Sequence, residues 1–239
     1  MSGERRPRPV FIAALTREIA GLVKGWQTDE SLAGRGIDLY WHEDAVAVCA
    51  GMGASRAALA VEAALALGPA SELVSVGWAG ACNRQLRVGD VIKADIVVDA
   101  KTGERYFSAR TRATGEDLRI VATVAVPAGA QEKARLAEAY YAAAVDMEAA
   151  TVARLARARD LPFYAIKAIS DGAEFEMPDM ARFTTPRGQL REAAFGVHIA
   201  LRPALWKPVL SMAKGSKLAA ERLRSEIGSH IEERGKHSE

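Results

Sequence analysis

The sequence predicts an α/β fold in which a strongly twisted, mixed central sheet is flanked by helices. Short apolar runs rich in β-branched residues alternate with Ala/Leu-rich stretches of helical length, and this alternation is typical of strands that helices cover on both faces. Turns of small residues follow several of these runs. No linker or change of composition divides the 239 residues, so we expect one domain over residues 1–239.

Apolar runs are predicted as strands, and longer Ala/Leu-rich stretches as helices. The strands are Val10 to Leu15, Ala45 to Ala50, Leu73 to Val76, Val88 to Val98, Ile120 to Val126 and Pro162 to Ile169. The helices are Arg17 to Trp26, Ser55 to Leu67, Ala130 to Tyr141, Glu148 to Arg159 and a C-terminal series from Gln189 onward. Two small-residue turns, GMGAS at 51–55 and GWAGA at 77–81, permit the close backbone approach that a pocket needs. The polar end of the chain, IGSHIEERGKHSE, is predicted to be frayed.

Composition narrows the functional classes. Lys and Arg number 32 against 30 Asp and Glu, a net charge of +2, so nucleic-acid binding has no overall electrostatic support. Cys49 and Cys82 lie in apolar stretches without the spacing of metal ligands, which predicts buried reduced thiols and no metal site. No stretch is long and apolar enough to span a membrane, and no signal-type segment precedes the first strand. We expect a cytoplasmic protein.

Several carboxylates stand at positions where α/β proteins place their ligands. Asp171 follows the apolar run that ends at Ile169, and carboxyl ends of sheet strands are the usual binding edge. The Asp-Gly pair is also a favoured turn, and that reading is the stronger one from the dipeptide alone. Glu18 follows the first strand at the start of a predicted helix, where the helix dipole stabilises a carboxylate whether or not it has a chemical role.

A third acidic cluster surrounds Met147. Asp146 and Glu148 flank this methionine at the entry to the helix predicted from Glu148 to Arg159. Acidic residues at such a position also serve as plain helix caps. Taken singly, none of these carboxylates identifies an active site.

Together, the order and surroundings of these motifs resemble the methylthioadenosine/S-adenosylhomocysteine nucleosidases of the nucleoside phosphorylase and nucleosidase superfamily. The resemblance covers roughly residues 10–175 and is carried by VFIAALTREIAGL, CAGMGASRAALA, LVSVGWAGACNRQLRVGDVI and AVDMEAATVARLARARDLPFYAIKAISDGAE. It implies that Glu18 activates the attacking water, that Met147 and Glu148 bind the ribose, and that Asp171 protonates the purine at N7. Gly77, Trp78 and Ser170 stand in the same motifs and are expected to contribute to the substrate site.

These roles suit the chemistry of glycosidic bond cleavage. The breaking bond leaves oxocarbenium character on the ribose and negative charge on the base, so a carboxylate near the ribose and an acid at the base both lower the barrier. The two groups need different environments to hold different protonation states. We expect a strand-end acid facing an apolar base pocket to be the protonated one.

Departures from the family pattern shape the expected reaction. Phosphorolytic relatives carry a phosphate-holding arginine where this chain has Ser75, so water is favoured over phosphate, and no cofactor is expected unless the reaction is phosphorolytic. Trp78 replaces a small hydroxyl residue, and Lys167 replaces an arginine. The stretch between Asp99 and Ile120 is short, and Val124 to Pro127 lies where an aromatic residue normally stacks on the base.

The C-terminal segment resembles the tail of the hopanoid-associated phosphorylase branch and not that of the methylthioadenosine enzymes. Members of that branch remove adenine from adenosylhopane, so the resemblance implies an adenine-type nucleoside with a bulky or lipid-linked 5′ substituent. Residues 196–225 form the expected basic amphipathic extension, in which basic residues alternate with apolar ones: Arg202, Lys207, Lys214, Lys217, Arg222 and Arg224 with Leu201, Leu205, Trp206, Val209, Leu210 and Met212. This composition is typical of an interfacial helix. An ordinary helix that packs on the domain or on a second subunit is the alternative.

Three functions therefore remain open. The first is a purine nucleosidase for a bulky or lipid-linked substrate, with peripheral membrane contact through the C-terminal segment. The second is a methylthioadenosine/S-adenosylhomocysteine nucleosidase or a purine nucleoside phosphorylase. The third is a non-catalytic nucleoside-binding protein, which the presence of Glu18, Glu148 and Asp171 disfavours. By analogy with the relatives we expect a homodimer.

Overall fold

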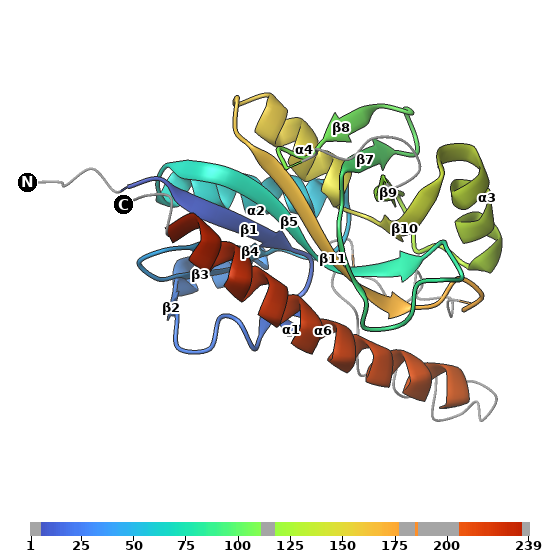
Figure 1. The fold of residues 1–239 in the computed structure, drawn as a ribbon. Helices are drawn as coiled ribbons and strands as arrows, with labels where there is room; N and C mark the ends of the chain where they lie inside the picture. Colours follow the sequence, from blue (N-terminus) through green and yellow to red (C-terminus); the bar gives the residue numbers. More distant parts are fainter. Residues whose placement is uncertain (1–5, 111–117, 177–184, 186–205, 236–239) are drawn as a thin grey trace, which may run out of the picture.

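The computed structural model describes residues 6–110, 118–176, 185 and 206–235, and all strands within them belong to one mixed sheet of eleven strands. The predicted α/β fold class is confirmed (Figure 1). The strands are β1 (Arg8–Ala13), β2 (Gln27–Thr28), β3 (Asp38–Trp41), β4 (Val46–Cys49), β5 (Ala70–Ala81), β6 (Val91–Lys93), β7 (Ile96–Asp99), β8 (Arg105–Phe107), β9 (Ile120–Thr123), β10 (Ala142–Asp146) and β11 (Phe163–Asp171). The helices are α1 (Thr16–Ile19), α2 (Ala54–Leu67), α3 (Ala130–Tyr140), α4 (Ala149–Arg157) and α6 (Trp206–Gly235), with a 3₁₀ helix, η1, at Glu30–Arg35.

The long strand β5 is the centre of the sheet. It pairs in parallel with β1 on one side and with β11 on the other, and its last residues pair antiparallel with β10. The sheet therefore divides at the carboxyl end of β5, where β11 continues to β6 and β10 continues through β9 and β7 to β8. The ends of β1, β5, β10 and β11 meet around this division, which makes it the natural place for a site.

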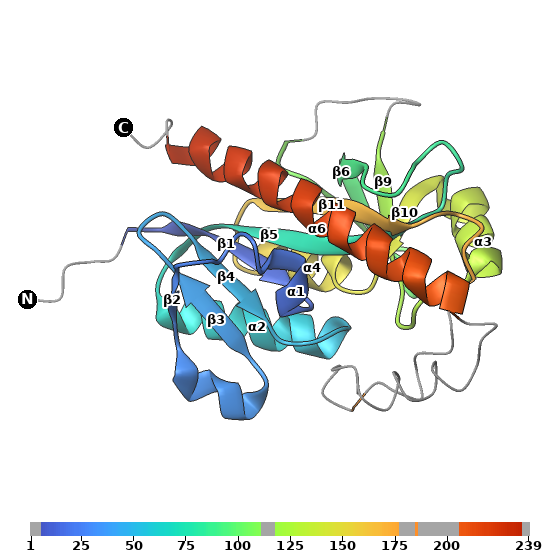
Figure 2. The same cartoon turned by 90° about the horizontal axis from the view of Figure 1, so that it is seen from below.

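Helices cover both faces of the sheet, as Figure 2 shows from below. Side chains alternate between two apolar clusters along each strand, so that Val10 and Ile12 pack on one side while Phe11 and Ala13 pack on the other. The first cluster includes α2 and α4, and the second includes residues of α6. This alternation is the pattern of fully buried strands.

Two predicted elements in the first half of the chain are wrong in extent. The helix predicted from Arg17 to Trp26 ends at Ile19, because glycines follow it and Gly25 adopts a φ of +86° that helices do not contain. The strand predicted from Val88 to Val98 is two strands, β6 and β7, separated by residues 94–95. β6 pairs with β11 and β7 with β8 and β9, so the separation lets one segment reach both branches of the sheet.

Small residues misled the prediction at two further places. The GWAGA segment at 77–81, predicted as a turn, is the last part of β5, since pairing with β11 and β10 outweighs the weak strand propensity of glycine. No strand was predicted at the Ala-rich residues 142–146, which form the strand β10. The helix after them, α4, begins at Ala149.

The C-terminal helix also differs from its prediction. It is a single helix, α6, that runs to Gly235, so the predicted extension at 196–225 ends too early and the segment predicted to fray from Ile227 is mostly helical. Ala219, Leu223 and Ile227 are fully buried against the sheet, and this packing fixes the helix on the fold. Residues 196–205 and the side chain of Trp206 lie outside the described part. Within that part, no helix is both long and apolar enough to cross a membrane.

Candidate active site

A cavity of about 790 Å³ lies at the division of the sheet, between the strand ends, α1 and α6. Its volume is within the usual range for small-molecule sites. Six of the predicted site residues line it: Glu18, Trp78, Met147, Glu148, Ser170 and Asp171. The seventh, Gly77, lies against Glu18: a Cβ atom at this position would come within 3.0 Å of Glu18 Oε2. Glycine thus leaves room for the carboxylate, and the predicted residues converge on one cavity.

Glu18 is buried at the cavity wall and is held by backbone groups. Its Oε2 accepts hydrogen bonds from the N–H groups of Ala14 and Leu15, each at 3.0 Å, and Oε1 accepts one from Trp78 at 3.2 Å. Burial raises the pKa of Glu18, although these N–H groups and the charge of Lys167 oppose the rise. A carboxylate with a fixed orientation and a raised pKa is well suited to accept a proton.

Glu148 approaches from the opposite wall. Its Oε1 accepts a 2.7 Å hydrogen bond from the N–H of Gly53, in the glycine turn before α2. Burial raises the pKa of Glu148 to about 7, and the neighbouring charge of Asp146 adds to the rise. Since β10 ends at Asp146, Met147 and Glu148 emerge from the strand directly into the cavity.

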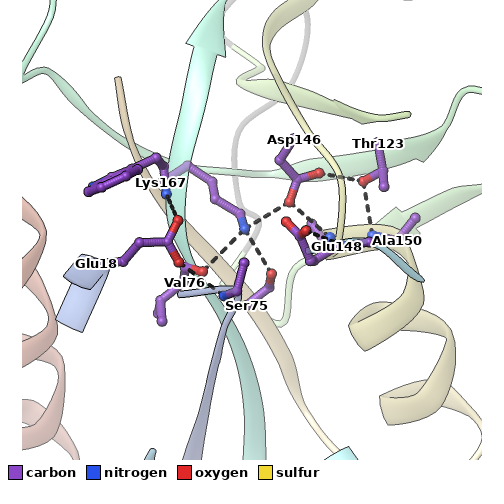
Figure 3. A network of polar contacts seen from close by, with 12 residues as sticks. Glu18, Ser75, Val76, Thr123, Asp146, Glu148, Ala150 and Lys167 are labelled. Atoms are coloured by element: carbon purple, nitrogen blue, oxygen red, sulfur yellow. Dashed lines mark hydrogen bonds and ion pairs between the residues drawn. The ribbon is translucent and has the colours of Figure 1, made fainter. Parts of the chain in front are cut away.

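Lys167 lies between these two carboxylates. Figure 3 shows its amino group among Ser75, Val76 and Asp146, with Glu18 and Glu148 on either side. The Nζ atom lies 2.8 Å from Asp146 Oδ2 and donates to Ser75 Oγ at 3.0 Å. Burial alone lowers the pKa of Lys167, but the negative charges of Asp146 and Glu148 outweigh it and raise the pKa. This ammonium is therefore charged and compensated by carboxylates.

Asp146 is fixed by more than Lys167. Its Oδ1 accepts a hydrogen bond from Thr123 Oγ1 at 2.6 Å, and its Oδ2 accepts one from the N–H of Ala149 at 2.9 Å. The second bond satisfies the N–H of Ala149, the first residue of α4, whose N-cap residue is Glu148. Asp146 thus holds both Lys167 and the start of the helix that follows Met147 and Glu148.

Asp171 lies at the other end of the cavity and is held on both oxygens. Its Oδ1 accepts a 2.6 Å hydrogen bond from Ser170 Oγ, and its Oδ2 forms an ion pair with Lys133 of α3. A register shift between Ile169 and Asp171 sets the carboxylate opposite Gly80 of β5. Such bulges re-aim side chains next to active sites.

Sequence reasoning missed several residues of the cavity. Lys133 lies on a helix of polar composition, and its partner is 38 residues away in the chain, so no local pattern marked it. The α6 side chains of Ala213, Ser216, Lys217, Ala220, Glu221 and Arg224 also line the cavity. Val124, Pro127 and Ala128 line it where a stacking aromatic residue was sought. This part of the wall is therefore aliphatic.

Trp78 narrows the cavity on the side of α1. The guanidinium carbon of Arg17 lies 5.1 Å from the centre of the Trp78 ring, a distance at which cation–π attraction is significant. The described residues include no group of three or more His, Cys, Asp or Glu side chains arranged to hold a metal ion. Carboxylates, lysines and arginines supply the charged groups that line the cavity.

Comparisons with known proteins agree with the sequence resemblance. The family model described as "Phosphorylase superfamily" matches residues 33–119 and 116–199. A 5′-methylthioadenosine/S-adenosylhomocysteine nucleosidase from Marinomonas sp. (strain MWYL1) is 28% identical over 202 residues, covering 70% of this chain and 87% of the relative.

Solved structures extend the comparison to the whole fold. The 5′-methylthioadenosine/S-adenosylhomocysteine nucleosidase of Helicobacter pylori superposes with a TM-score of 0.69 at 16% identity, covering 97% of this chain and 100% of that one. The futalosine hydrolase of the same organism gives a TM-score of 0.64 at 15% identity, covering 93% and 98% of the two chains. The likeness of fold thus extends over most of the chain.

Proposed function

The chain belongs to the Phosphorylase superfamily and is an enzyme, and from this premise we propose that it hydrolyses the N-glycosidic bond of a purine nucleoside. The observation that carries the proposal is the convergence of Glu18, Glu148 and Asp171, from three separate segments, on one cavity. By their names, the relatives reported above are two 5′-methylthioadenosine/S-adenosylhomocysteine nucleosidases and a futalosine hydrolase.

Each carboxylate has a distinct role in this reaction. Glu18, fixed by three backbone N–H groups, accepts a proton from the attacking water as oxygen bonds to the anomeric carbon. Glu148 accepts hydrogen bonds from the ribose hydroxyls, while Met147 packs on the sugar. The electron pair of the broken bond moves into the purine, and Asp171 delivers a proton to N7, so that a neutral base leaves.

The charge of the site favours water over phosphate as the nucleophile. Ser75, which stands in place of a phosphate-holding arginine, is fully buried and accepts a hydrogen bond from Lys167. The positive charge of Lys167 is already compensated by Asp146 and Glu148. A phosphate dianion placed beside Ser75 would be repelled by these carboxylates and would find Lys167 already compensated. Three further cations of the cavity wall, Arg17, Lys217 and Arg224, belong to α1 and α6.

The finer proposal is that the 5′ substituent of the nucleoside is bulky and apolar, and in the limiting case a lipid. The support is a large cavity whose α6 wall presents the short side chains of Ala213, Ser216 and Ala220. Two leucines of α6, Leu210 and Leu218, are 62% and 39% exposed, which would favour contact with an apolar surface. The opposite side of α6 is committed to the sheet, so any membrane contact would be peripheral.

A substrate panel tests the proposal at both levels. The purified chain would be incubated with adenosine, inosine, methylthioadenosine, S-adenosylhomocysteine and adenosylhopane in detergent, and free base would be measured by chromatography. We expect base release from at least one purine nucleoside and faster release as the 5′ substituent becomes larger and more apolar. If none is cleaved, the nucleosidase proposal fails. Preference for adenosine over every 5′-substituted compound would refute only the finer one.

Vesicle binding separates substrate size from membrane contact. We expect the full chain to co-sediment with anionic phosphatidylglycerol vesicles and a Leu210→Ser/Leu218→Ser variant to do so less. If the two proteins sediment equally, Leu210 and Leu218 of α6 make no contact with the membrane.

A further inference from the structure

Lys133 is a buried lysine at the base end of the cavity, and the reaction derived above gives it no role. Its side chain is 1% exposed, yet it is among the residues that line the cavity. Its amino group contacts Asp171 Oδ2 and donates to the carbonyl oxygens of Gly172 and Phe175, at 2.9 and 3.4 Å. These three acceptors match the three protons of an ammonium group. The contacts leave no donor of Lys133 for a substrate.

Gly80 provides the space in which Lys133 and Asp171 form their ion pair. Gly80 of β5 faces it, and a Cβ atom there would come within 2.8 Å of Lys133 Cε and 2.9 Å of Asp171 Oδ2. The absence of a side chain at Gly80 is therefore what lets Lys133 of α3 and Asp171 of β11 meet above the end of β5.

A buried ion pair adds little to the stability of a fold. The cost of removing two charges from water commonly equals or exceeds their attraction, and apolar residues of the same size often serve equally well. The pair also lies at the one carboxylate that the proposed reaction uses as an acid. The ion pair requires Asp171 to be a carboxylate, whereas the sequence analysis expected this acid to be protonated. Asp171 therefore needs a source for the proton that the leaving base takes up.

We propose that Lys133 is a positioning residue that holds Asp171 and stores the proton which Asp171 delivers to the base. This inference rests on the proposed hydrolysis. As the glycosidic bond breaks and its electron pair moves into the purine, a proton passes from Lys133 Nζ to the Asp171 carboxylate and from that carboxyl group to N7. Lys133 ends as a neutral amine and Asp171 as a carboxylate. The proton that Glu18 took from water returns to Lys133 through solvent, so no net proton is consumed.

The test compares leaving groups, because a structural role would affect all substrates alike. Lys133→Met would be assayed with the best purine nucleoside of the panel and with 4-nitrophenyl β-ribofuranoside, whose phenolate leaves without being protonated. We expect kcat for the nucleoside to fall by about 10² or more, as for loss of a general acid, with KM nearly unchanged. For the nitrophenyl riboside we expect less than a threefold change. Equal losses on both substrates would overturn the inference.

Lys93→Met is the matched control. Lys93, on the outer strand β6, forms an ion pair with Glu226 of α6 and does not line the cavity. We therefore expect Lys93→Met to cleave both substrates at the wild-type rate.

A double-mutant cycle keeps the inference testable if Lys133→Met does not fold. In an Asp171→Asn background, removal of Lys133 leaves no uncompensated carboxylate at the pair. If Lys133 acts only through Asp171, the double variant cleaves the nucleoside as fast as Asp171→Asn alone. A further loss of tenfold or more would overturn the inference. Failure of the proposed function is distinct, since then the wild-type chain itself would release no base.

Discussion

Replacement of Lys167 by methionine should destabilise the fold in a manner that depends on pH. Methionine keeps an unbranched side chain that is one atom shorter than that of lysine, and it removes the charge. The change leaves Asp146 without the ammonium that lies 2.8 Å from its Oδ2, and it removes a charge that lowers the pKa of Glu18 and of Glu148. Breaking a buried ion pair from one side costs about 3–5 kcal/mol. For a domain of this size that corresponds to a fall in Tm of roughly 6–20 °C.

The pH dependence follows from the sign of the two shifts. Burial raises the folded-state pKa of Glu18 and of Glu148, the latter to about 7. A raised carboxyl pKa means that the folded state holds protons which the unfolded state has released, so this contribution to stability is lost as pH rises through the folded pKa. Without Lys167 both pKa values rise further, and the loss extends to higher pH. Lys167→Met should therefore lower the unfolding free energy less at pH 5.5 than at pH 8.

The assay is urea denaturation of both proteins at these two pH values, followed by tryptophan fluorescence. Lys93→Met is the control, because its ion pair with Glu226 is 26% and 36% exposed at the two side chains and should contribute only about 0–1 kcal/mol. Equal destabilisation of Lys167→Met at both pH values, or a loss no greater than that of the control, would refute the electrostatic account of the site.

Three further predictions concern the carboxylates and their surroundings. Asp171→Asn should lower kcat by about 10²–10⁴ with KM nearly unchanged, since the proton is needed in the transition state; near wild-type turnover in steady-state kinetics would remove Asp171 from the mechanism. The shift of the Glu148 pKa from 4.5 to about 7 makes the unfolding free energy decline by on the order of 3 kcal/mol between pH 5 and 8. Glu148→Gln should remove this part of the decline. If denaturation at several pH values gives an unchanged slope, the burial of this carboxyl group is contradicted. Gly80→Ala should separate Lys133 from Asp171 and lower kcat. Gly34→Ala is the control, because a Cβ atom there meets nothing within 4 Å, and it should leave kcat unchanged. Equal kcat for the two variants would count against the close packing of Lys133 and Asp171.

The sequence predicted where the candidate site residues lie more accurately than it predicted some of the strands. Glu18 and Asp171 follow apolar runs that fold as β1 and β11, and strand ends that share one sheet edge bring such residues together whatever the details of the loops. The glycine turn before α2 was also placed correctly, and Gly53 within it binds Glu148. Local patterns sufficed because each of these residues is adjacent to the element that positions it.

Other features depend on contacts between distant segments. Residues 142–146 are alanine-rich and have no strand signal of their own, yet pairing with β5 and β9 makes them the strand β10. Lys133 is polar on a polar helix, and only the meeting of α3 with the end of β11 buries it. His230 near the chain end is buried beside Glu72 of β5, so the polar end of α6 is ordered by a partner 158 residues away. The sequence pattern of one segment does not indicate which distant segment will pack against it.

The identity of the nucleophile tests the central claim most directly. The chain would be incubated with its best purine nucleoside in buffer with and without inorganic phosphate, and ³¹P NMR would follow the phosphate while chromatography follows the base. We predict the same rate of base release in both buffers, a free ribosyl product and no ribosyl phosphate signal, because Lys167 is compensated by carboxylates and Ser75 offers no cation. A rate that rises with phosphate, together with a new ribosyl 1-phosphate resonance, would contradict this account.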